Sequence, residues 1–257
     1  MRLFFRFLFP ATYFEATRVP SLELKIYNGL VEWLPAFAFA LYFNDLRPQA
    51  VLAVLFSYGA FISIYEIGYL TNDLFSEKYE DEPRGRASRF QGSEATVYAL
   101  IAVRLIFFAI FTSLLGAANS WLWWGFHGSL VAVFALHNIL PGEMRVATFF
   151  CLSAFRFFGP MIIAVPPLVL MVLFPAVLLN HSLYRTTVYL RSKFQDARVA
   201  ETVLSKLAFY AGCFPLSVLL SFLYDSWIPA GLCVYFGLIW IMYLAASRVT
   251  GWKPGPG

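Results

Sequence analysis

Residues 49–80 read QAVLAVLFSYGAFISIYEIGYLTNDLFSEKYE and pass from an almost unbroken apolar run into a charged segment. The apolar part is as long as the roughly 20 residues that an α-helix needs to cross the hydrocarbon core of a bilayer. Polar and apolar residues do not alternate along it, as they would in a strand of a membrane barrel. The stretch therefore predicts a helix that crosses the membrane and then leaves it with charged side chains.

Four carboxylates share one face of this predicted helix. Glu66, Asp73, Glu77 and Glu80 follow one another at intervals of seven, four and three residues, which bring side chains to the same helical face. Pro83 is expected to end the helix. Acidic side chains on one face repel each other, and a divalent cation such as Mg²⁺, which binds a few carboxylates together with water and phosphate oxygens, removes the repulsion. The pattern favours a Mg²⁺ site at Asp73, Glu77 and Glu80, with a solvated charged loop as the alternative.

The composition extends this prediction to the whole chain. Of the 257 residues, 60% are hydrophobic and 13% are charged, whereas soluble domains average about 25% charged residues. We expect an all-α, polytopic membrane bundle of about eight transmembrane helices, with residues 23–257 as one catalytic domain and residues 1–22 as an N-terminal interfacial segment. The eight apolar stretches are 24–43, 49–71, 95–116, 120–140, 146–164, 165–184, 205–224 and 227–247.

The distribution of positive charge predicts the orientation of these spans. With a cytosolic N-terminus, sixteen of the nineteen Lys and Arg residues lie on the cytosolic side, Arg47 lies opposite, and Arg104 and Arg156 lie within spans. Such a bias fixes the orientation of helical membrane proteins. Both termini and the two long loops, 72–94 and 185–204, are then cytosolic, and we expect the bacterial inner membrane. Because the basic residues flank spans and form no soluble face, nucleic acid is not an expected partner.

The charged segment after the second span resembles a known motif. The stretch NDLFSEKYEDEPRGRASRF, residues 72–90, is similar to the first acidic motif of the UbiA superfamily of intramembrane prenyltransferases, N-D-x-x-D-x-x-x-D followed by basic residues. Asn72 and Asp73 match this motif and Glu80 stands at its third acidic position, while Ser76 replaces the second Asp and Glu77 follows it. The basic residues of the motif correspond to Arg86 and Arg89.

Two further stretches resemble the same superfamily. TRVPSLELKIYNGLVEWLPAFAF, residues 17–39, is similar to its opening, and LHNILPGEMRVATFF, residues 136–150 with Arg145, is similar to the segment between its fourth and fifth spans. The layout of eight spans with large cytosolic loops after spans 2 and 6 also agrees. The resemblance implies a Mg²⁺-dependent enzyme that acts on an isoprenoid diphosphate or a lipid phosphate among membrane lipids.

One part of the superfamily pattern is missing. The second acidic motif, D-x-x-x-D after span 6, is replaced by NHSLYRTTVYLRSKFQDARVAE, residues 180–201, which has Asn180 and Tyr184 near the expected positions. This basic loop could bind phosphate directly, because arginine binds phosphate oxygens through two parallel hydrogen bonds. Its candidate substrate-binding residues are Tyr184, Arg185, Arg191 and Lys193, beside Asn72, Glu66, Arg86, Arg89 and Arg145 elsewhere in the chain.

Glu66, Arg104 and Arg156 are charged residues expected at depth in the bilayer. Charged side chains in spans are costly and are usually paired or functional. A structural ion pair of Glu66 with Arg104 or Arg156 is one interpretation, and a substrate cavity open to the cytosol, with Arg156 as a catalytic residue beside Asp73, Glu77 and Glu80, is the other. Arg156 also resembles an arginine of the superfamily branch that transfers phosphoribosyl groups to polyprenyl phosphate.

Three functions follow from these patterns. The first is transfer of a prenyl group from a prenyl diphosphate to an aromatic or other acceptor, with release of diphosphate. The second is transfer of a sugar phosphate from a sugar diphosphate such as phosphoribosyl diphosphate to a lipid phosphate. The third is a non-catalytic, lipid-binding member of the superfamily, for which the missing aspartates are the reason. The sequence makes no prediction of the oligomeric state.

Overall fold

The structure is a computed structural model that describes residues 5–79, 94–193 and 202–250, and within these ranges all regular structure is helical. This confirms the all-α prediction. Five of the described helices are long and apolar enough to cross a membrane, namely Pro48–Asp73, Glu94–Leu114, Pro167–Arg191, Val203–Leu223 and Ile228–Ala246. These helices indicate a membrane protein.

The helices are joined by short connections wherever the connection is described. Their bounds are α2 Thr12–Arg18, α3 Leu22–Asn28, η1 Gly29–Trp33, α4 Leu34–Phe43, α5 Pro48–Tyr79, α6 Glu94–Leu114, η2 Ala117–Asn119, α7 Trp121–Ile139, α8 Arg145–Phe158, α9 Pro167–Val177, η3 Leu178–Ser182, α10 Leu183–Lys193, α11 Val203–Leu223 and α12 Ile228–Thr250. The segments η1 and η3 are π-helical turns inside otherwise continuous helices, and η2 is a 3₁₀ turn.

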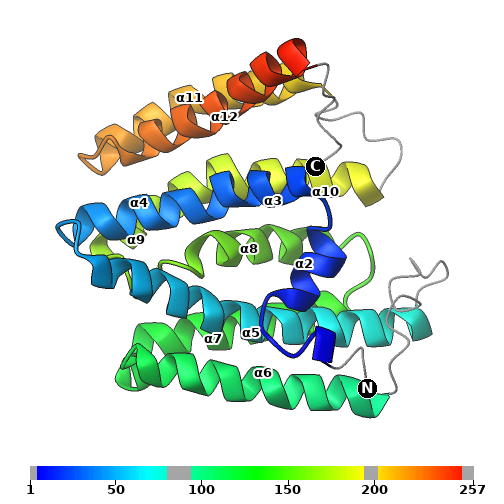
Figure 1. Cartoon of the computed structure of the whole chain (residues 1–257). Coiled ribbons are helices and arrows are strands. Elements are labelled where there is room, and N and C mark those ends of the chain that lie inside the picture. The colour runs from blue at the N-terminus through cyan, green and yellow to red at the C-terminus, as the bar shows by residue number, and fades with distance from the viewer. Residues whose placement is uncertain (1–4, 80–93, 194–201, 251–257) are drawn as a thin grey trace.

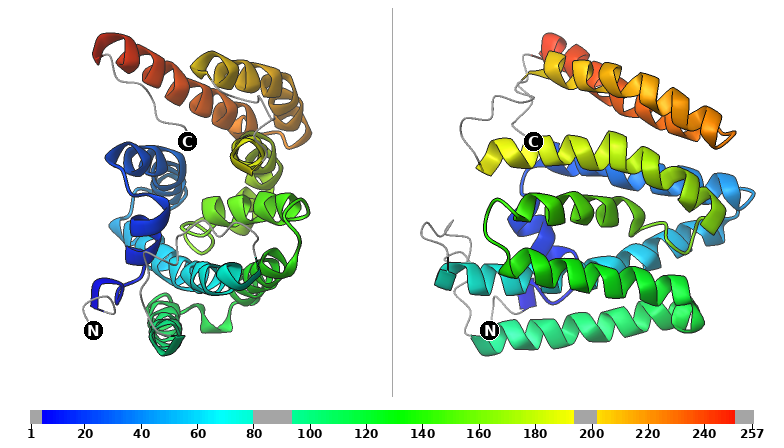
Figure 2. Two further views of the ribbon diagram at one scale, coloured as in Figure 1. Left: turned by 90° about the vertical axis from the view of Figure 1, so that its right-hand side faces the viewer. Right: turned by 180° about the vertical axis from the view of Figure 1, so that it is seen from behind.

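Consecutive long helices run in opposite directions, so their connections gather at two ends of the molecule (Figures 1 and 2). We call the end where α5 and α10 finish and α6, α8 and α11 begin the loop end. The opposite end, where α4 joins α5, α6 joins α7, α8 joins α9 and α11 joins α12, is the turn end. This arrangement brings the carboxyl-terminal part of α5, with Asp73, to the loop end.

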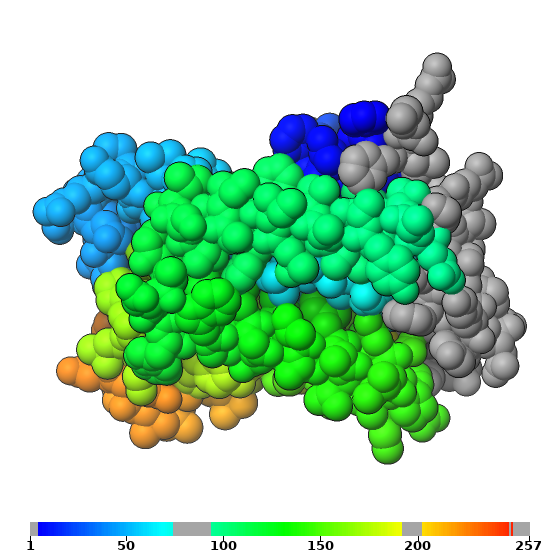
Figure 3. All heavy atoms as spheres, turned by 90° about the horizontal axis from the view of Figure 1, so that it is seen from below, coloured from blue at the N-terminus to red at the C-terminus, as the bar shows by residue number. Residues whose placement is uncertain are grey.

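Helix α5 is the most enclosed of the long apolar helices. In its membrane-crossing window 67% of the residues are buried, against 22% in α11. Figure 3 shows α6 and α7 covering one face, with only a narrow strip of α5 visible between them. Close contact is possible because Gly68 has no side chain, since a Cβ there would lie 2.4 Å from the ring of Phe134 in α7. Most side chains in this window of α5 therefore face the interior rather than lipid.

The π-helical turn η1 has a cause in the sequence. Pro35 follows it, and a proline ring in a helix clashes with the carbonyl group of the residue four positions earlier, here Val31. A wider turn at that carbonyl accommodates the ring without ending the helix. The turn contains Glu32, which is 3% exposed, so the irregular backbone lies where an acidic side chain enters the interior.

The amino-terminal segment folds back into the molecule. The side chains of Phe7, Tyr13 and Phe14 are almost fully buried, and α2 packs against α5. Figure 1 shows this segment crossing the long helices near the loop end. The part of the predicted interfacial segment that the structure describes thus contributes to the interior of the bundle.

Candidate functional site

Three buried ion pairs lie inside the described part of the bundle, and each joins one carboxylate to one arginine. They are Glu66 with Arg104, Asp73 with Arg18, and Glu32 with Arg156, at N–O distances of 2.6, 2.8 and 2.6 Å. Two of the carboxylates are on α5, and two of the three pairs include a residue from the first 32 positions of the chain. The amino-terminal segment is thus a large part of the polar interior.

Glu66 and Arg104 form the most enclosed of the three pairs. Both side chains have no exposed surface. Arg104 also donates to the backbone carbonyl oxygens of residues 7–9 at 2.7 to 3.1 Å, and Glu66 accepts from the backbone N–H of Phe14 at 2.7 Å. The pairing of Glu66 with Arg104 that the sequence offered is therefore present, and its other contacts fix the amino-terminal segment against α5 and α6. These contacts support the structural interpretation of this pair.

Asp73 lies two helical turns further along α5 and contacts two residues of α2. Its two carboxylate oxygens lie 2.8 and 3.0 Å from Nη2 of Arg18, and one of them accepts a hydrogen bond from the Tyr13 hydroxyl at 2.5 Å. Burial and the Asp73 carboxylate raise the pKa of Tyr13 above its ordinary value, so its hydroxyl stays protonated and continues to donate. Asn72 adds a long contact of 3.5 Å from its side-chain amide to Asp73.

Arg18 has unused hydrogen-bonding capacity. Burial opposes its positive charge, but Asp73 together with Tyr69 and Tyr13 outweighs this effect, and the pKa of Arg18 lies above its ordinary value. The guanidinium stacks over the ring of Tyr69 at 4.3 Å. Its Nη1 atom is buried and has no hydrogen-bond partner among the residues that the structure describes. An acceptor oxygen beside Arg18 would therefore complete this group, because a buried donor without an acceptor is costly.

Arg156 of α8 is oriented by the π-helical turn η1 and the helix before it. Its Nη2 atom lies 2.6 Å from Glu32 and donates to the side-chain oxygen of Asn28 at 2.6 Å. The guanidinium also lies 4.9 Å from the ring centre of Phe14. The predicted catalytic residue Arg156 is thus buried and contacts the same α2 segment as Asp73, but its charge is already balanced by a carboxylate.

Aromatic rings separate the pairs. Phe14 stacks on Tyr69 with ring centres 6.1 Å apart, and Tyr65 lies 5.0 Å from Tyr69 and 4.8 Å from Phe134. These rings come from α2, α5 and α7. The interior near Asp73 and Arg156 is therefore aromatic as well as charged.

The predicted residues of the second loop lie in a different cluster. Tyr184 is buried against the rings of Phe209, Tyr210 and Trp240, at centre distances of 5.5 to 5.8 Å. Arg185 follows it on α10, which also carries Arg191. This cluster belongs to α10, α11 and α12, whereas the contacts of Asp73 come from α2.

The remaining predicted residues are only partly described. Arg145 begins α8 and donates through Nε to the carbonyl oxygen of Leu140 at 2.9 Å, so one of its contacts fixes the preceding turn. The side chains of Glu77 and Lys193, and the whole of Glu80, Arg86 and Arg89, lie outside the described residues.

The described groups at Asp73 do not fit a Mg²⁺ site. Both oxygens of Asp73 already contact Arg18, whose guanidinium balances the carboxylate charge. Within the described ranges, no three His, Cys, Asp or Glu side chains are arranged to hold a metal ion. The Mg²⁺ prediction therefore rests on Glu77 and Glu80 as well as Asp73, and the described structure supplies one of the three side chains.

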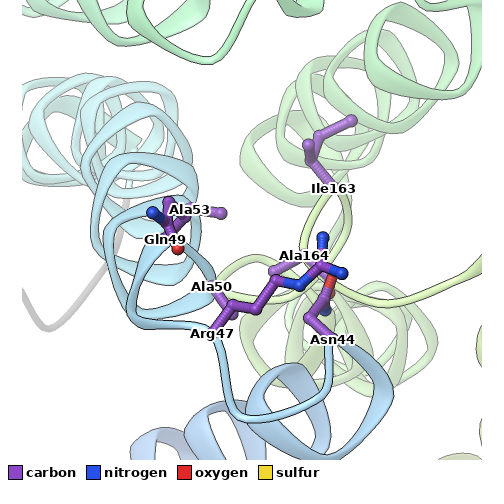
Figure 4. A pocket seen from close by; sticks show the side chains of 7 residues that line it. All are labelled: Asn44, Arg47, Gln49, Ala50, Ala53, Ile163 and Ala164. Carbon is purple, nitrogen blue, oxygen red and sulfur yellow. The ribbon is translucent and has the colours of Figure 1, made fainter.

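A pocket of about 370 Å³ lies at the turn end, far along the bundle from Asp73. It is lined by Asn44, Arg47, Gln49, Ala50, Ala53, Ile163 and Ala164. Figure 4 shows Arg47 reaching from the α4–α5 turn toward Ala164, and the Asn44 amide donates to the carbonyl oxygen of Ala164 at 2.8 Å. None of the predicted site residues lines this pocket, and its contacts connect the α4–α5 and α8–α9 turns.

Sequence reasoning missed three residues of the polar interior: Tyr13, Arg18 and Glu32. Arg18 precedes the first predicted span, 24–43, and Glu32 lies within it. Glu32 carried a usable signal, because a carboxylate inside an apolar stretch needs a cationic partner. Once Glu66 is assigned to Arg104, Arg156 is the arginine within the predicted spans that still lacks a carboxylate partner.

Comparison with known proteins gave no match: no family model fits the chain, and no curated protein or solved structure is significantly similar to it.

Proposed function

We propose that the chain is an intramembrane transferase of the UbiA type, with eight membrane passes and its loop end in the cytosol of a bacterial inner membrane. In this proposal it moves a prenyl group from an isoprenoid diphosphate to an aromatic or other acceptor. The resemblance of residues 72–90 supports the family, and the alternating direction of the helices supports the eight passes (Figure 1).

The observation that carries the proposal is that one hydrogen-bond donor of Arg18 lacks an acceptor among the described residues. Its Nη1 is buried without a partner, beside an aromatic interior and next to a carboxylate on the motif helix. A diphosphate oxygen would supply the missing acceptor, because guanidinium groups bind phosphate oxygens strongly and with defined geometry. A donor bound there would have its apolar chain among the rings of Phe14, Tyr65 and Tyr69.

The chemistry assigned to this chain is charge stabilisation. The bond between the prenyl carbon and the diphosphate oxygen breaks with its electron pair on oxygen, and Arg18 neutralises the departing charge. Ring faces near the carbon stabilise the allylic cation. The acceptor nucleophile then forms the new bond and releases its proton to solvent. A Mg²⁺ requirement through Asp73, Glu77 and Glu80 is a separate hypothesis within this proposal, and Arg86, Arg89, Arg185, Arg191 and Lys193 are its further candidate diphosphate contacts.

Two other functions are each favoured by one observation. A sugar-phosphate transferase acting on polyprenyl phosphate is favoured by the buried Arg156 and by the arginines of α10. A non-catalytic lipid-binding protein is favoured by the pairing of Glu32, Glu66 and Asp73 with arginines, which leaves none of these carboxylates free in the described structure.

Thermal stability of the detergent-purified protein distinguishes these functions, because a ligand of the native state raises the apparent melting temperature by mass action. We expect farnesyl diphosphate at 100 times its Kd to stabilise the wild type, and Arg18→Met to lose the shift. The assay is run with and without Mg²⁺, and Glu80→Gln tests the metal hypothesis separately, because it leaves Asp73, the partner of Arg18, unchanged. Release of inorganic diphosphate during turnover is the second readout.

Lys25→Met is the matched control, because Lys25 forms an exposed pair with Glu15 in the same amino-terminal region. It should respond to farnesyl diphosphate as the wild type does. A shift with phosphoribosyl diphosphate alone would favour the sugar-phosphate transferase. Folded protein that responds to neither diphosphate, with or without Mg²⁺, would contradict the transferase proposal.

A further inference from the structure

The pocket at the turn end has a lining of mixed polarity (Figure 4). Hydrogen-bonding side chains on the α4–α5 turn and the start of α5 form one part of it: Asn44, Arg47 and Gln49. The other part is apolar and mostly small: Ala50, Ala53, Ile163 and Ala164. At about 370 Å³ the pocket is within the range of roughly 300–1,000 Å³ that is usual for ligand sites. Its lining suits an occupant that joins a polar group to an apolar part.

The α4–α5 turn beside the pocket has an unusual backbone conformation. Asp45 and Leu46 both have positive φ angles, of 52° and 57°, in the left-handed region that residues other than glycine rarely adopt. The Asn44 amide fixes the turn, because it donates to the carbonyl oxygens of Ala40 and Ala164 at 2.7 and 2.8 Å. The backbone of this turn is therefore anchored to the α8–α9 turn on the other side of the pocket.

Arg47 brings a positive charge to the pocket, and its described ion pair is weak. Its Nη2 atom lies 3.8 Å from Asp45, and the two side chains are 72% and 87% exposed. Such a pair contributes little, because solvent and salt screen it. In the predicted topology Arg47 is also the Lys or Arg that lies opposite the cytosolic side, where basic residues are avoided. An anion in the pocket can therefore bind Arg47 without breaking a strong ion pair.

Exposed apolar side chains surround the pocket's end of the molecule. Tyr42 and Leu46, close to Arg47 in the chain, are 75% and 74% exposed, and Trp121 at the start of α7 is 82% exposed. Aromatic residues of membrane proteins gather at the level of the lipid headgroups. The turn end thus fits the headgroup region of a bilayer, where the abundant anion is the lipid phosphate.

We propose that this pocket binds the headgroup of an anionic phospholipid from the leaflet at the turn end. The phosphate oxygens accept hydrogen bonds from the guanidinium of Arg47, which binds phosphate through paired donors, and from the side-chain amide of Gln49. The glycerol and the first acyl carbons lie against the apolar part of the lining. The site is at the opposite end of the bundle from Arg18, and it does not depend on the transferase proposal.

The test measures lipid binding by the detergent-purified protein and a set of matched variants. Arg47→Met removes the charge, Arg47→Lys keeps it, and Ala53→Leu fills the pocket while the charge stays. Lys25→Met removes another exposed and paired cation, far from the pocket in the chain. The added compounds are phosphatidylglycerol, dioleoylglycerol without a phosphate, and glycerol 3-phosphate without acyl chains, at matched ionic strength. Melting temperatures and lipid retention in native mass spectra are measured.

We expect phosphatidylglycerol to raise the melting temperature of the wild type, Lys25→Met and Arg47→Lys, because a ligand of the native state stabilises it. Arg47→Met should bind phosphatidylglycerol about tenfold more weakly, as the loss of a charged hydrogen bond predicts. Ala53→Leu should also lose the response, although its charge is unchanged. Dioleoylglycerol and glycerol 3-phosphate should each have a smaller effect than the complete lipid.

An equal response to phosphatidylglycerol in wild type and Arg47→Met would overturn the site. A response that Arg47→Met loses but Ala53→Leu keeps would place the lipid on Arg47 outside the pocket, which also contradicts the proposal. Dioleoylglycerol as effective as phosphatidylglycerol would show that the phosphate is not recognised, and a response to glycerol 3-phosphate alone would identify a soluble phosphate compound instead of a lipid. Arg18→Met should respond to phosphatidylglycerol as the wild type does, so this proposal and the transferase proposal can fail separately.

Discussion

Two carboxylates of α5 each pair with an arginine: Glu66 with Arg104, and Asp73 with Arg18. The two pairs have the same chemistry, but they differ in how many of the arginine's hydrogen-bond donors have partners. In the first pair both side chains are fully buried, and Arg104 uses Nε, Nη1 and Nη2 in hydrogen bonds. In the second pair Arg18 is 12% exposed, and its Nη1 has no partner. The pairs are seven residues apart on one helix, so their difference comes from the elements that surround them.

The difference indicates which pair can take part in binding. A buried polar network with every donor satisfied is rigid and has no capacity left for a ligand. Arg18 has one donor, Nη1, without a described partner, and it lies near the loop end. It can therefore bind an anion without breaking its bond to Asp73. We therefore infer that Glu66 and Arg104 connect segments of the chain and that Arg18 and Asp73 face the ligand.

The largest expected effect is that of Arg104→Met. This substitution leaves Glu66 charged and buried without a cation, and it removes the donors to the carbonyl groups of residues 7–9. Breaking a buried pair in this way costs about 3–5 kcal/mol. The measurement is the free energy of unfolding in mixed detergent and sodium dodecyl sulfate, followed by circular dichroism.

The double variant Glu66→Leu/Arg104→Met is the control for that experiment. Removing both charges of a buried pair is much less costly than removing one. It should regain part of the lost stability, and the unpaired carbonyl groups of residues 7–9 should prevent full recovery. A loss below about 1 kcal/mol in Arg104→Met would contradict the structural role of the pair.

Arg18→Met should have a smaller effect on stability. Asp73 keeps the hydrogen bond from Tyr13, and the pair is closer to solvent than that of Glu66. We expect a loss of about 1–2 kcal/mol, between the values of exposed and fully buried pairs. The same unfolding measurement applies, and a loss as large as that of Arg104→Met would mean that both pairs are structural.

The smallest expected effect is that of Lys25→Met. Lys25 and Glu15 pair at 2.9 Å, but their side chains are 48% and 53% exposed. Solvent and salt screen such a pair, and its contribution is below about 0.5 kcal/mol. The unfolding free energy should therefore equal that of the wild type within error. A larger loss would show that Lys25 has a role beyond this pair.

Much of the fold could be predicted because apolar length determines where membrane helices form. The apolar run 49–71 lies within α5. This helix continues to Tyr79, as predicted from the carboxylates that share one helical face beyond the apolar run. Helix α8 ends at Phe158, earlier than the predicted 146–164, and α9 begins at Pro167, where the paired prolines predict a break. The turn between them is as apolar as the helices, so hydropathy alone could not locate the end of α8.

The candidate site was less predictable because its contacts join distant parts of the chain. Glu66 and Arg104 could be paired from their depth in neighbouring spans, but nothing local indicates that Arg18 contacts Asp73. That contact needs α2 to fold back across α5, which the polar composition of the amino-terminal segment does not suggest. Glu32 was missed because a single acid in an apolar stretch was treated as part of the span.

The contacts of Arg104 also set an order of events during synthesis. Residues 7–9 are made before their partner Arg104, which follows them by about 95 residues in the chain. At synthesis rates of about 5–20 residues per second this delay is about 5–20 seconds. During that time the carbonyl groups of residues 7–9 lack the donors of Arg104. These residues therefore reach their final position only after α6 has been made.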